Sequence, residues 1–177
     1  MPLSWTIVEA PAPMGALTIG VTDAGLALVA FGDDPDAPRR AADRLGEPLV
    51  QDGSTGPAAR ELREYLAGQR RVFDVPLDWR LTAGSQRRVL ESLFDSVAYG
   101  ATVTYGKLAA RSGLGAGHRA ARGVGSIMGS NPLPVVVPCH RVMAADGLGG
   151  FGGGRATKEW LLALEGVLTP ALDFGPE

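Results

Sequence analysis

The spacing of the apolar residues changes about halfway along the chain, and this change limits the folds that the chain can adopt. Within the first 31 residues the pattern favours strands at 5–10, 17–21 and 26–31. The stretch Thr22-Asp23-Ala24-Gly25 predicts a hairpin turn between the second and third strands. After residue 84 the apolar residues recur at helical spacing instead. We therefore expect an α/β (α+β) protein, with a small N-terminal α/β domain and a mainly helical C-terminal domain.

The remainder of the first half predicts one helix and one more strand. Residues 32–57 are rich in Asp, Pro and Gly and are expected to form a surface connection. Residues 57–69 predict a helix with Leu62, Tyr65 and Leu66 on one face, and residues 72–77 a returning strand.

Four helices are expected in the second half. Ser85 is expected to cap a helix that ends by Gly100, and Thr104 to cap a short helix over 105–111. The other two are expected over 118–128 and 155–165. The two short helices favour a helix-turn-helix, although a plain helical hairpin is the commoner arrangement.

Two irregular segments lie between these helices. Residues 131–142 contain a run of valines between prolines, which predicts a buried extended segment with an incomplete set of backbone donors. Residues 147–154 contain six glycines in eight positions. Such a loop lets the backbone come very close to a ligand, and a flexible hinge is the alternative.

Length and charge suggest two domains with different tasks. We place one domain at 1–80, a second domain at 81–168 and a tail at 169–177. Residues 1–80 carry eight Arg against twelve Asp and Glu, whereas residues 81–168 carry nine Lys and Arg against five Asp and Glu. The second domain is therefore the one expected to contact phosphate.

Composition narrows the setting in which the chain works. No apolar run approaches the roughly 20 residues of a membrane span, so we expect no membrane partner. One cysteine and two histidines make a poor zinc set, so we expect no metal site. A single cysteine and no secretory signal favour a cytoplasmic protein.

The single cysteine lies in the run Pro138-Cys139-His140-Arg141-Val142. A lone cysteine is usually a small buried hydrophobe. Here a base and a cation follow Cys139 directly, and both favour the thiolate that acts as a nucleophile. We therefore expect Cys139 to be the reactive residue of the chain.

Glu165 is a candidate partner for His140. The helix dipole disfavours an acid in a last helical turn, so either a solvated helix end or a carboxylate that orients His140 would explain it. Successive side chains of a strand point to opposite faces. Cys139 and His140 can therefore meet only if the chain turns there or a water joins them, which argues against an ordinary cysteine-peptidase pair.

The same run, with Asn131-Pro132 before it, resembles the active-site signature of the O6-alkylguanine-DNA alkyltransferases, also called methylated-DNA–protein-cysteine methyltransferases. Further stretches resemble the family's motifs in the same order. These are TYGKLA at 104–109 and AARGVG at 120–125 for the DNA-binding helices, GGFGG at 149–153 for the substrate loop, and KEWLL at 158–162 with Glu165-Gly166 for the final helix. The resemblance spans residues 84–166, and residues 1–80 match only in general layout.

The resemblance implies a fold and a function. The N-terminal domain (1–80) would be a ribonuclease H-like support domain. The C-terminal domain (81–168) would bind DNA and carry the alkyl acceptor, with a winged-helix-like fold and a helix-turn-helix. The chain would flip O6-alkylguanine out of duplex DNA and move the alkyl group irreversibly to its own cysteine, in one turnover and without a cofactor. Its partner would be double-stranded DNA containing O6-alkylguanine, and the protein would be a monomer in the absence of DNA.

The resemblance also assigns roles by position. Cys139 would accept the alkyl group, His140 would be the water-mediated base, and Glu165 would hold His140. Asn131 would fix the active-site turn, and Tyr105 would donate to the guanine and aid flipping.

The remaining implied roles concern DNA and the flipped base. Arg122 would enter the base stack at the place that the base left, and small residues would permit close approach to the minor groove. The implied DNA contacts are Thr104, Tyr105, Ala121, Arg122 and Gly123, and the implied base contacts are the carbonyls of Cys139 and Val142 and the N–H groups near Phe151 and Gly152.

The chain departs from the family's pattern at several places. Residues 113–118 lengthen the turn between the two short helices, and Ser85 stands where an aromatic residue is frequent. Gly123 replaces a usual Ala, which should loosen its helix by up to about 1 kcal/mol. Gly152 lies where some relatives carry Ser, which would widen the tolerance for bulky alkyl groups. His118 is expected at the surface.

Three other functions fit parts of the pattern. A non-catalytic damage-binding module would lack the acceptor cysteine, which is present here. A cysteine hydrolase would turn over and would need no DNA. A transcriptional regulator that senses alkylation through Cys139 would need more domains than 177 residues allow.

Overall fold

The computed structural model describes residues 2–51 and 55–168, which divide into two compact units. The first unit takes the chain up to Arg87 together with Pro132–Val136. The second takes Arg88–Asn131 and the chain from Val137 onward. The division falls inside α3 (Gly84–Ser96), beyond the boundary expected after residue 80. The predicted tail at 169–177 lies outside the described residues.

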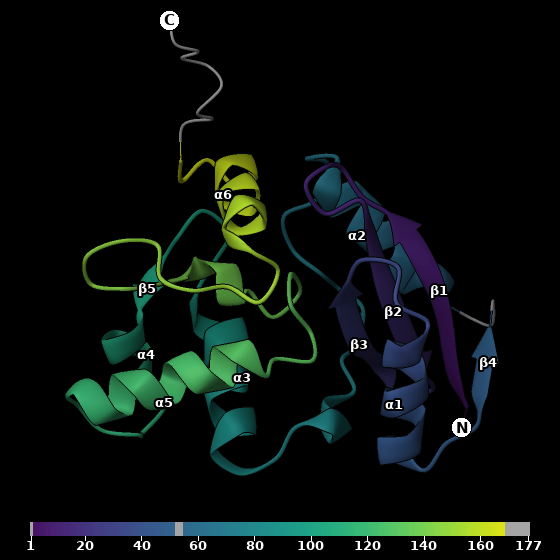
Figure 1. Ribbon diagram of the computed structural model, residues 1–177, viewed down its shortest axis with the longest axis horizontal. Helices are drawn as coiled ribbons and strands as arrows, with labels where there is room; N and C mark the ends of the chain where they lie inside the picture. The colour runs from purple at the N-terminus through teal and green to yellow at the C-terminus, as the bar shows by residue number, and fades with distance from the viewer. Residues whose placement is uncertain (1, 52–54, 169–177) are drawn as a thin grey trace, which may run out of the picture. The chain divides into compact units, whose positions relative to one another are not determined.

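A four-stranded sheet forms the centre of the first unit (Figure 1). Its order is β3-β2-β1-β4, with β1–β2 and β2–β3 antiparallel and β4 parallel to β1. The three predicted strands and their hairpin turn are confirmed, and each strand buries apolar residues in the core of the unit. The strands are β1 (Leu3–Glu9), β2 (Ala16–Thr22), β3 (Gly25–Phe31) and β4 (Leu49–Gln51).

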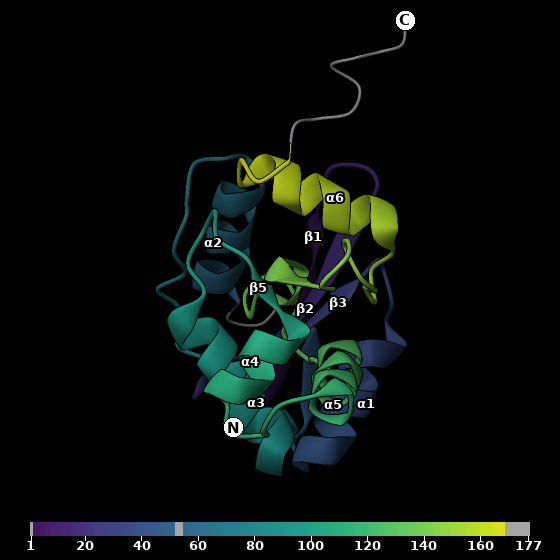
Figure 2. The same ribbon diagram turned by 90° about the vertical axis from the view of Figure 1, so that its left-hand side faces the viewer.

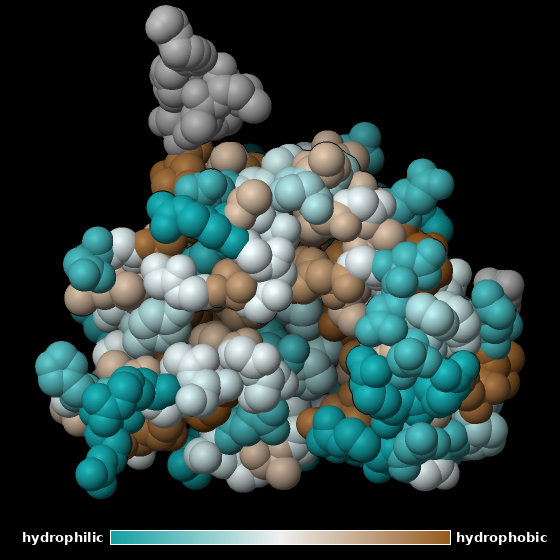
Figure 3. All heavy atoms as spheres, viewed as in Figure 1, coloured by the Kyte–Doolittle hydropathy of each residue, from teal (hydrophilic) through white to brown (hydrophobic). Residues whose placement is uncertain are grey.

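The prediction of a surface connection over 32–57 is wrong, because this segment contains β4 and helix α1 (Asp36–Leu45). Ala37, Ala41 and Ala42 recur at helical spacing and pack into the core of the first unit. Pro38 stands in the first turn, where a helix tolerates proline. Hydrophilic atoms gather over the outer face of α1 (Figure 3), which explains how a polar-looking segment forms an amphipathic helix.

The predicted helix over 57–69 is confirmed as α2 (Gly56–Leu66), with Leu62, Tyr65 and Leu66 buried. The prediction of a strand over 72–77 is wrong. The buried carboxylate of Glu61 accepts the N–H groups of Asp74 and Val75, at 2.9 and 3.0 Å. Because those donors are used and Pro76 has none, this segment pairs with β3 only through a bridge between Leu26 and Leu77. The short helix η1 (Trp79–Leu81) follows it.

The second unit is mainly helical, as predicted. Its helices are α3, α4 (Tyr105–Arg111), α5 (His118–Gly129) and α6 (Arg155–Leu164), and it contains the turn η2 (Cys139–Arg141) and the parallel pair β5 (Val103–Thr104) and β6 (Val142–Met143). Helices α4 and α5 pack against each other (Figure 2), the pairing expected of the predicted helix-turn-helix. None of the described helices is long and apolar enough to cross a membrane.

Of the two predicted N-terminal helix caps, Thr104 and Ser85, the structure confirms one. Thr104 caps α4 as predicted, because its hydroxyl accepts the Lys107 N–H at 3.2 Å. Ser85 does not cap α3, since that helix already begins at Gly84. The side-chain oxygen of Gln86 accepts the Ala83 N–H at 3.3 Å and supports this end instead. The helix also ends at Ser96, before the predicted limit at Gly100.

The segment 131–142 is buried as predicted, but the expectation of an extended chain is wrong. Val135 adopts a φ of 75°, which a β-branched residue rarely takes, and turns replace a strand around it. Within the first unit, the carbonyl of Pro132 accepts the Val29 N–H from β3 at 2.8 Å. This attachment to a sheet strand helps to hold the turn in place.

Gly25 provides a test of this packing. An added Cβ would lie 2.1 Å from the carbonyl oxygen of Pro76, and its φ of 135° disfavours other residues. We expect Gly25→Ala to lower the free energy of unfolding in urea by about 3 kcal/mol or more, through overlap and backbone strain. Gly32→Ala is the control, because Gly32 also has a positive φ but open space around it. Its expected loss is about 1 kcal/mol, and equal losses would contradict the packing described.

Candidate active site

Cys139 begins the 3₁₀ turn η2, directly after Pro138. Its N–H donates to the Val137 carbonyl at 2.8 Å, and the Arg141 N–H donates to the Pro138 carbonyl at 2.9 Å. The chain therefore turns at the cysteine, which is the condition under which Cys139 and His140 can act on one region. The Asn131 side chain supports this turn by donating to the Val137 carbonyl at 3.0 Å.

The cysteine borders a cavity of about 380 Å³ in the second unit. That volume is in the range of small-molecule sites. The cavity unites α4, α5, η2 and the glycine-rich loop, and three of the predicted site residues line it with the cysteine. Its lining consists of Tyr105, Gly125, Met128, Gly129, Cys139, Gly150, Phe151 and Gly152.

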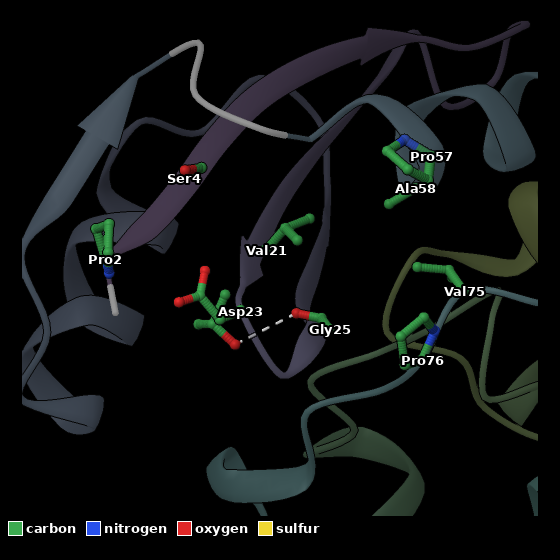
Figure 4. Close-up of a pocket in the computed structure, with 10 residues that line it drawn as sticks. Pro2, Ser4, Val21, Asp23, Gly25, Pro57, Ala58, Val75 and Pro76 are labelled. Atoms are coloured by element: carbon green, nitrogen blue, oxygen red, sulfur yellow. Dashed lines mark hydrogen bonds between the residues drawn. The ribbon is translucent and has the colours of Figure 1, made fainter.

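A second cavity of about 390 Å³ lies in the first unit (Figure 4). Its lining is mostly proline and small residues, and it contains neither cysteine nor histidine. The hairpin turn contributes Asp23, and Thr22 donates to the Gly25 carbonyl at 3.5 Å. Because its hydroxyls and the Asp23 carboxylate have no thiol or imidazole beside them in the lining, this cavity is the weaker candidate for chemistry.

Burial sets the resting state of the cysteine. It raises the pKa of the Cys139 thiol to about 11, although a hydrogen bond from Asn131 and the charge of Lys158 both act to lower it. At neutral pH the residue is therefore a thiol, and an attack by its sulfur needs a base to take the proton.

His140 and Glu165 form a buried pair. Nε2 of His140 lies 2.8 Å from Oε2 of Glu165, and neither side chain is exposed. The prediction that Glu165 lies at the end of the last helix is confirmed, since it follows α6 directly as its C-terminal cap. A carboxylate in this position fixes the ring orientation of a histidine, as in catalytic triads.

Arg141 contacts the same carboxylate from the other side. Its Nε donates to Oε1 at 2.8 Å and its Nη2 to Oε2 at 2.9 Å. The sequence suggested Arg141 as the cation that favours the thiolate, but its guanidinium is directed at Glu165. The charge that favours the thiolate comes from Lys158 instead.

The protonation states of the pair follow from these contacts. Burial alone would raise the pKa of Glu165, but the hydrogen bonds from His140 and Arg141 outweigh it and hold that pKa well below its ordinary value. Burial lowers the pKa of His140, and the charges of Arg141 and Lys158 lower it further against the opposing effect of Glu165. At neutral pH the site therefore holds a carboxylate and a neutral imidazole.

Lys158 of α6 is a fully buried cation that sequence reasoning did not single out. Its Nζ donates to the carbonyls of Val142 at 2.7 Å, Leu148 at 2.5 Å and Gly150 at 3.1 Å. Burial lowers its pKa to about 8, with the charge of Cys139 opposing that shift. The sequence did contain a sign of this burial. Lys158 lies three residues before Leu161 and four before Leu162, which places it on the apolar face of the predicted helix.

Tyr105 contacts the glycine-rich loop at Gly149 and Gly150. Its hydroxyl donates to the Gly150 carbonyl at 3.5 Å, and burial raises its pKa. An added Cβ on Gly149 would lie 2.7 Å from that hydroxyl, and Gly149 has a φ of 76°. Glycine is therefore required at this position for the loop to pass so close to Tyr105.

The predicted DNA contacts lie on α4 and α5. Arg122 is exposed on α5, whereas Ala121 and Gly123 are half-buried and Thr104 caps α4. A Cβ on Gly123 would meet only the Leu114 side chain, at an ordinary 3.9 Å, so the alanine usual in the family would fit here. His118 is exposed, as predicted. Among the described residues no cluster of His, Cys, Asp and Glu could hold a metal ion.

Comparison with known protein families gives two matches that together cover most of the chain. The "6-O-methylguanine DNA methyltransferase, ribonuclease-like domain" family matches residues 7–79, and its "DNA binding domain" counterpart matches residues 84–167. A methylated-DNA–protein-cysteine methyltransferase of Mycolicibacterium paratuberculosis is 40% identical over 162 residues, which are 90% of this chain and 91% of the relative. This chain belongs to the methylated-DNA–protein-cysteine methyltransferase family.

Solved structures of the methyltransferase family agree with this assignment. The chain is similar to the crystal structure of Mycobacterium tuberculosis OGT in complex with DNA, with a TM-score of 0.75 and 33% identity over 92% of each chain. It is also similar to the O6-methylguanine-DNA methyltransferase of the hyperthermophilic archaeon Pyrococcus kodakaraensis, with a TM-score of 0.66 and 29% identity over 93% of this chain and 99% of that one. The predicted resemblance and fold class are confirmed.

Replacing Lys158 with Met tests whether this cation holds the glycine-rich loop. Methionine keeps most of the length of the side chain but removes the donors to three carbonyls. We expect amide hydrogen exchange over residues 147–152 to accelerate at least about tenfold, the equivalent of one charge-assisted hydrogen bond, while α3 keeps its protection. Arg155→Met is the matched control, because Arg155 is an exposed cation on the same helix that pairs with Glu159. Unchanged exchange in the Lys158 variant would refute the anchoring role.

Proposed function

We propose that this chain repairs DNA by direct reversal, moving an alkyl group from O6 of guanine in duplex DNA to the sulfur of Cys139 in a single turnover. The observation that carries the proposal is a buried thiol at the edge of a cavity, next to a neutral histidine held by a carboxylate. Family membership supports the same reaction. The proposed partner is double-stranded DNA containing O6-alkylguanine.

The base would have to leave the duplex before it could react. An O6-alkyl group inside stacked DNA cannot reach a buried sulfur, so the nucleotide must be extruded, which costs a few kcal/mol. Arg122 is exposed on α5 and would fill the space in the stack and offset part of that cost. The small residues Ala121 and Gly123 and the cap Thr104 would allow α4 and α5 to approach the groove closely.

The cavity would receive the flipped base. Carbonyls of Cys139 and Val142 would accept from the guanine amine, and N–H groups near Phe151 and Gly152 would approach the ring. Lys158 already donates to the Val142 carbonyl, which fixes the direction of that acceptor, and a carbonyl oxygen can accept a second hydrogen bond. Asn131 would keep the turn at Cys139 in place.

The transfer itself would need the thiol to lose a proton and the guanine to gain one. The thiol proton would pass through a water to Nδ1 of His140, while Glu165 stabilises the imidazolium at Nε2. The sulfur would attack the alkyl carbon in line, forming the S–C bond as the O6–C bond breaks. Tyr105 would donate a hydrogen bond to the leaving guanine and pass it a proton, and the proton that the thiol gave to His140 would restore the tyrosine through water, so that the thiol loses one proton and the guanine gains one. The product thioether has no step that regenerates the thiol, so the reaction stops after one turnover.

The setting follows from the same chemistry. A reactive thiol persists in a reducing compartment, which favours the cytoplasm, with the protein on chromosomal DNA when it acts. The resemblance to the family implies a monomer in the absence of DNA.

Mass measurement tests the reaction. Incubation with a duplex that carries O6-methylguanine is expected to add one methylene equivalent to the intact protein, with peptide mapping placing it at Cys139 and unmodified guanine left in the DNA. Cys139→Ser is expected to gain nothing. Tight DNA binding with unchanged mass would favour a damage-binding module, and continuing release of product would favour a hydrolase, so either result would contradict the proposal.

Arg122→Ala tests the flipping step. We expect its rate of alkyl uptake from duplex DNA to fall at least about tenfold, because extrusion loses a compensating contact worth a few kcal/mol. Its reaction with free O6-methylguanine base should stay unchanged, since no stack has to open. Arg119→Ala, an exposed arginine on the same helix, controls for lost phosphate attraction. Equal losses on both substrates would rule out the role assigned to Arg122.

A further inference from the structure

Arg141 follows His140 in the chain, and its side chain makes its own set of contacts. Besides its two contacts with Glu165, its Nη1 donates to the Val97 carbonyl at 2.8 Å. Its guanidinium also lies over the ring of Tyr99, 5.8 Å from the centroid. Tyr99 is held in turn by its hydroxyl, which donates to the Leu164 carbonyl at 3.1 Å. Arg141 is therefore a fixed and almost wholly buried cation.

The geometry of the guanidinium matters as much as its charge. Nε and Nη2 meet the two oxygens of Glu165 as a parallel pair, which is the arrangement that a guanidinium makes best with a carboxylate. One negative charge is thus matched by one positive charge within hydrogen-bond distance. His140 meets a carboxylate that already has its counter-ion.

This charge balance decides which form of His140 is stable. A protonated His140 would leave a net positive charge in a buried site that also contains the Lys158 ammonium. A neutral His140 keeps Nε2–H as the donor to Oε2 of Glu165, and it leaves the lone pair on Nδ1. The ring is then a base at Nδ1, at the nitrogen that faces away from the carboxylate.

We propose that Arg141 is a positioning residue for alkyl transfer, which neutralises Glu165 and so keeps His140 uncharged and able to accept the thiol proton. This inference rests on the proposed function, because it concerns the base of that reaction. Among the described residues, the charged and titratable groups that face His140 are Arg141 and Cys139 on η2, Lys158 on α6 and Glu165 at the C-terminal cap of α6. Of these, only Arg141 compensates Glu165 directly.

Removal of the arginine charge should make His140 hold its proton. In Arg141→Met, Glu165 keeps its charge but loses the guanidinium, so that a protonated His140 becomes the cation that balances it. We expect the protonation midpoint of His140 to rise by at least about one pH unit, the effect of an unbalanced carboxylate in contact. The pH at which alkyl uptake reaches half its maximum should rise by the same amount.

The titration can be followed by NMR, because the chain contains two histidines. His118 is exposed, and a His118→Gln background leaves one histidine signal to follow. Two further variants separate charge from structure. Arg141→Lys keeps the positive charge and should keep the His140 midpoint close to that of the wild type, although it loses the paired hydrogen bonds. The double variant Arg141→Met/Glu165→Gln removes both charges and should bring the midpoint back down.

The outcomes discriminate between the two roles. If Arg141 had only a structural role, Arg141→Lys and Arg141→Met would lower alkyl uptake equally. The double variant would then have the same His140 midpoint as Arg141→Met. An unchanged midpoint in Arg141→Met overturns the inference. If Arg141→Met does not fold, a raised midpoint in the double variant or in Arg141→Lys overturns it. Absence of alkyl uptake by the wild type would defeat the proposed function alone, since the midpoints test the charge balance without DNA.

Discussion

The structure of the site depends on one buried carboxylate. Glu165 receives Nε2 of His140 and a paired contact from Arg141, each within 2.9 Å. These contacts join the turn that carries the cysteine to the end of α6. A buried carboxylate without partners would be very costly, so each contact is needed to keep this charge inside the protein. The orientation of His140 follows from that requirement.

The junction at Glu165 also fixes the ends of the chain segment that forms the cavity wall. Residues 142–154 leave η2 and return to α6, so both of their ends are held by elements joined at Glu165. Between those ends, Lys158 holds three carbonyls and Tyr105 lies against Gly149. Ordering a glycine-rich loop costs much conformational entropy, so without these contacts the loop would be poorly ordered. Its position next to the cysteine therefore depends on two polar side chains as well as on the glycine at 149.

Much of the site could be predicted because its chemistry is local in the sequence. Cys139 and His140 are adjacent, and Glu165 stands at a helix end where an acid is unfavourable without a partner. The strands of the first unit and the helices of the second follow from apolar spacing. Helix α1 was not predicted from the sequence, because alanines form its apolar face and give a weak periodic signal among Asp, Pro and Arg.

What could not be predicted depends on contacts distant in sequence. The valine run turns at Val135 instead of extending, because it packs within a buried core and its neighbour Pro132 bonds to β3. The partner of Arg141 lies 24 residues away, so adjacency to the cysteine gave the wrong expectation for its charge. Lys158 looked like one more polar residue of a helix. Its burial and its hydrogen bonds to three carbonyls show that it anchors a loop.

The central claim is that a balanced carboxylate keeps His140 neutral, with its proton on Nε2. Neutron diffraction from a deuterium-exchanged crystal of the wild-type protein at neutral pH would locate that proton directly. The account predicts a deuteron on Nε2, pointing at Oε2 of Glu165, and none on Nδ1. Deuterons on both ring nitrogens, or one on Nδ1 alone, would contradict it, because His140 could not then accept the proton of Cys139.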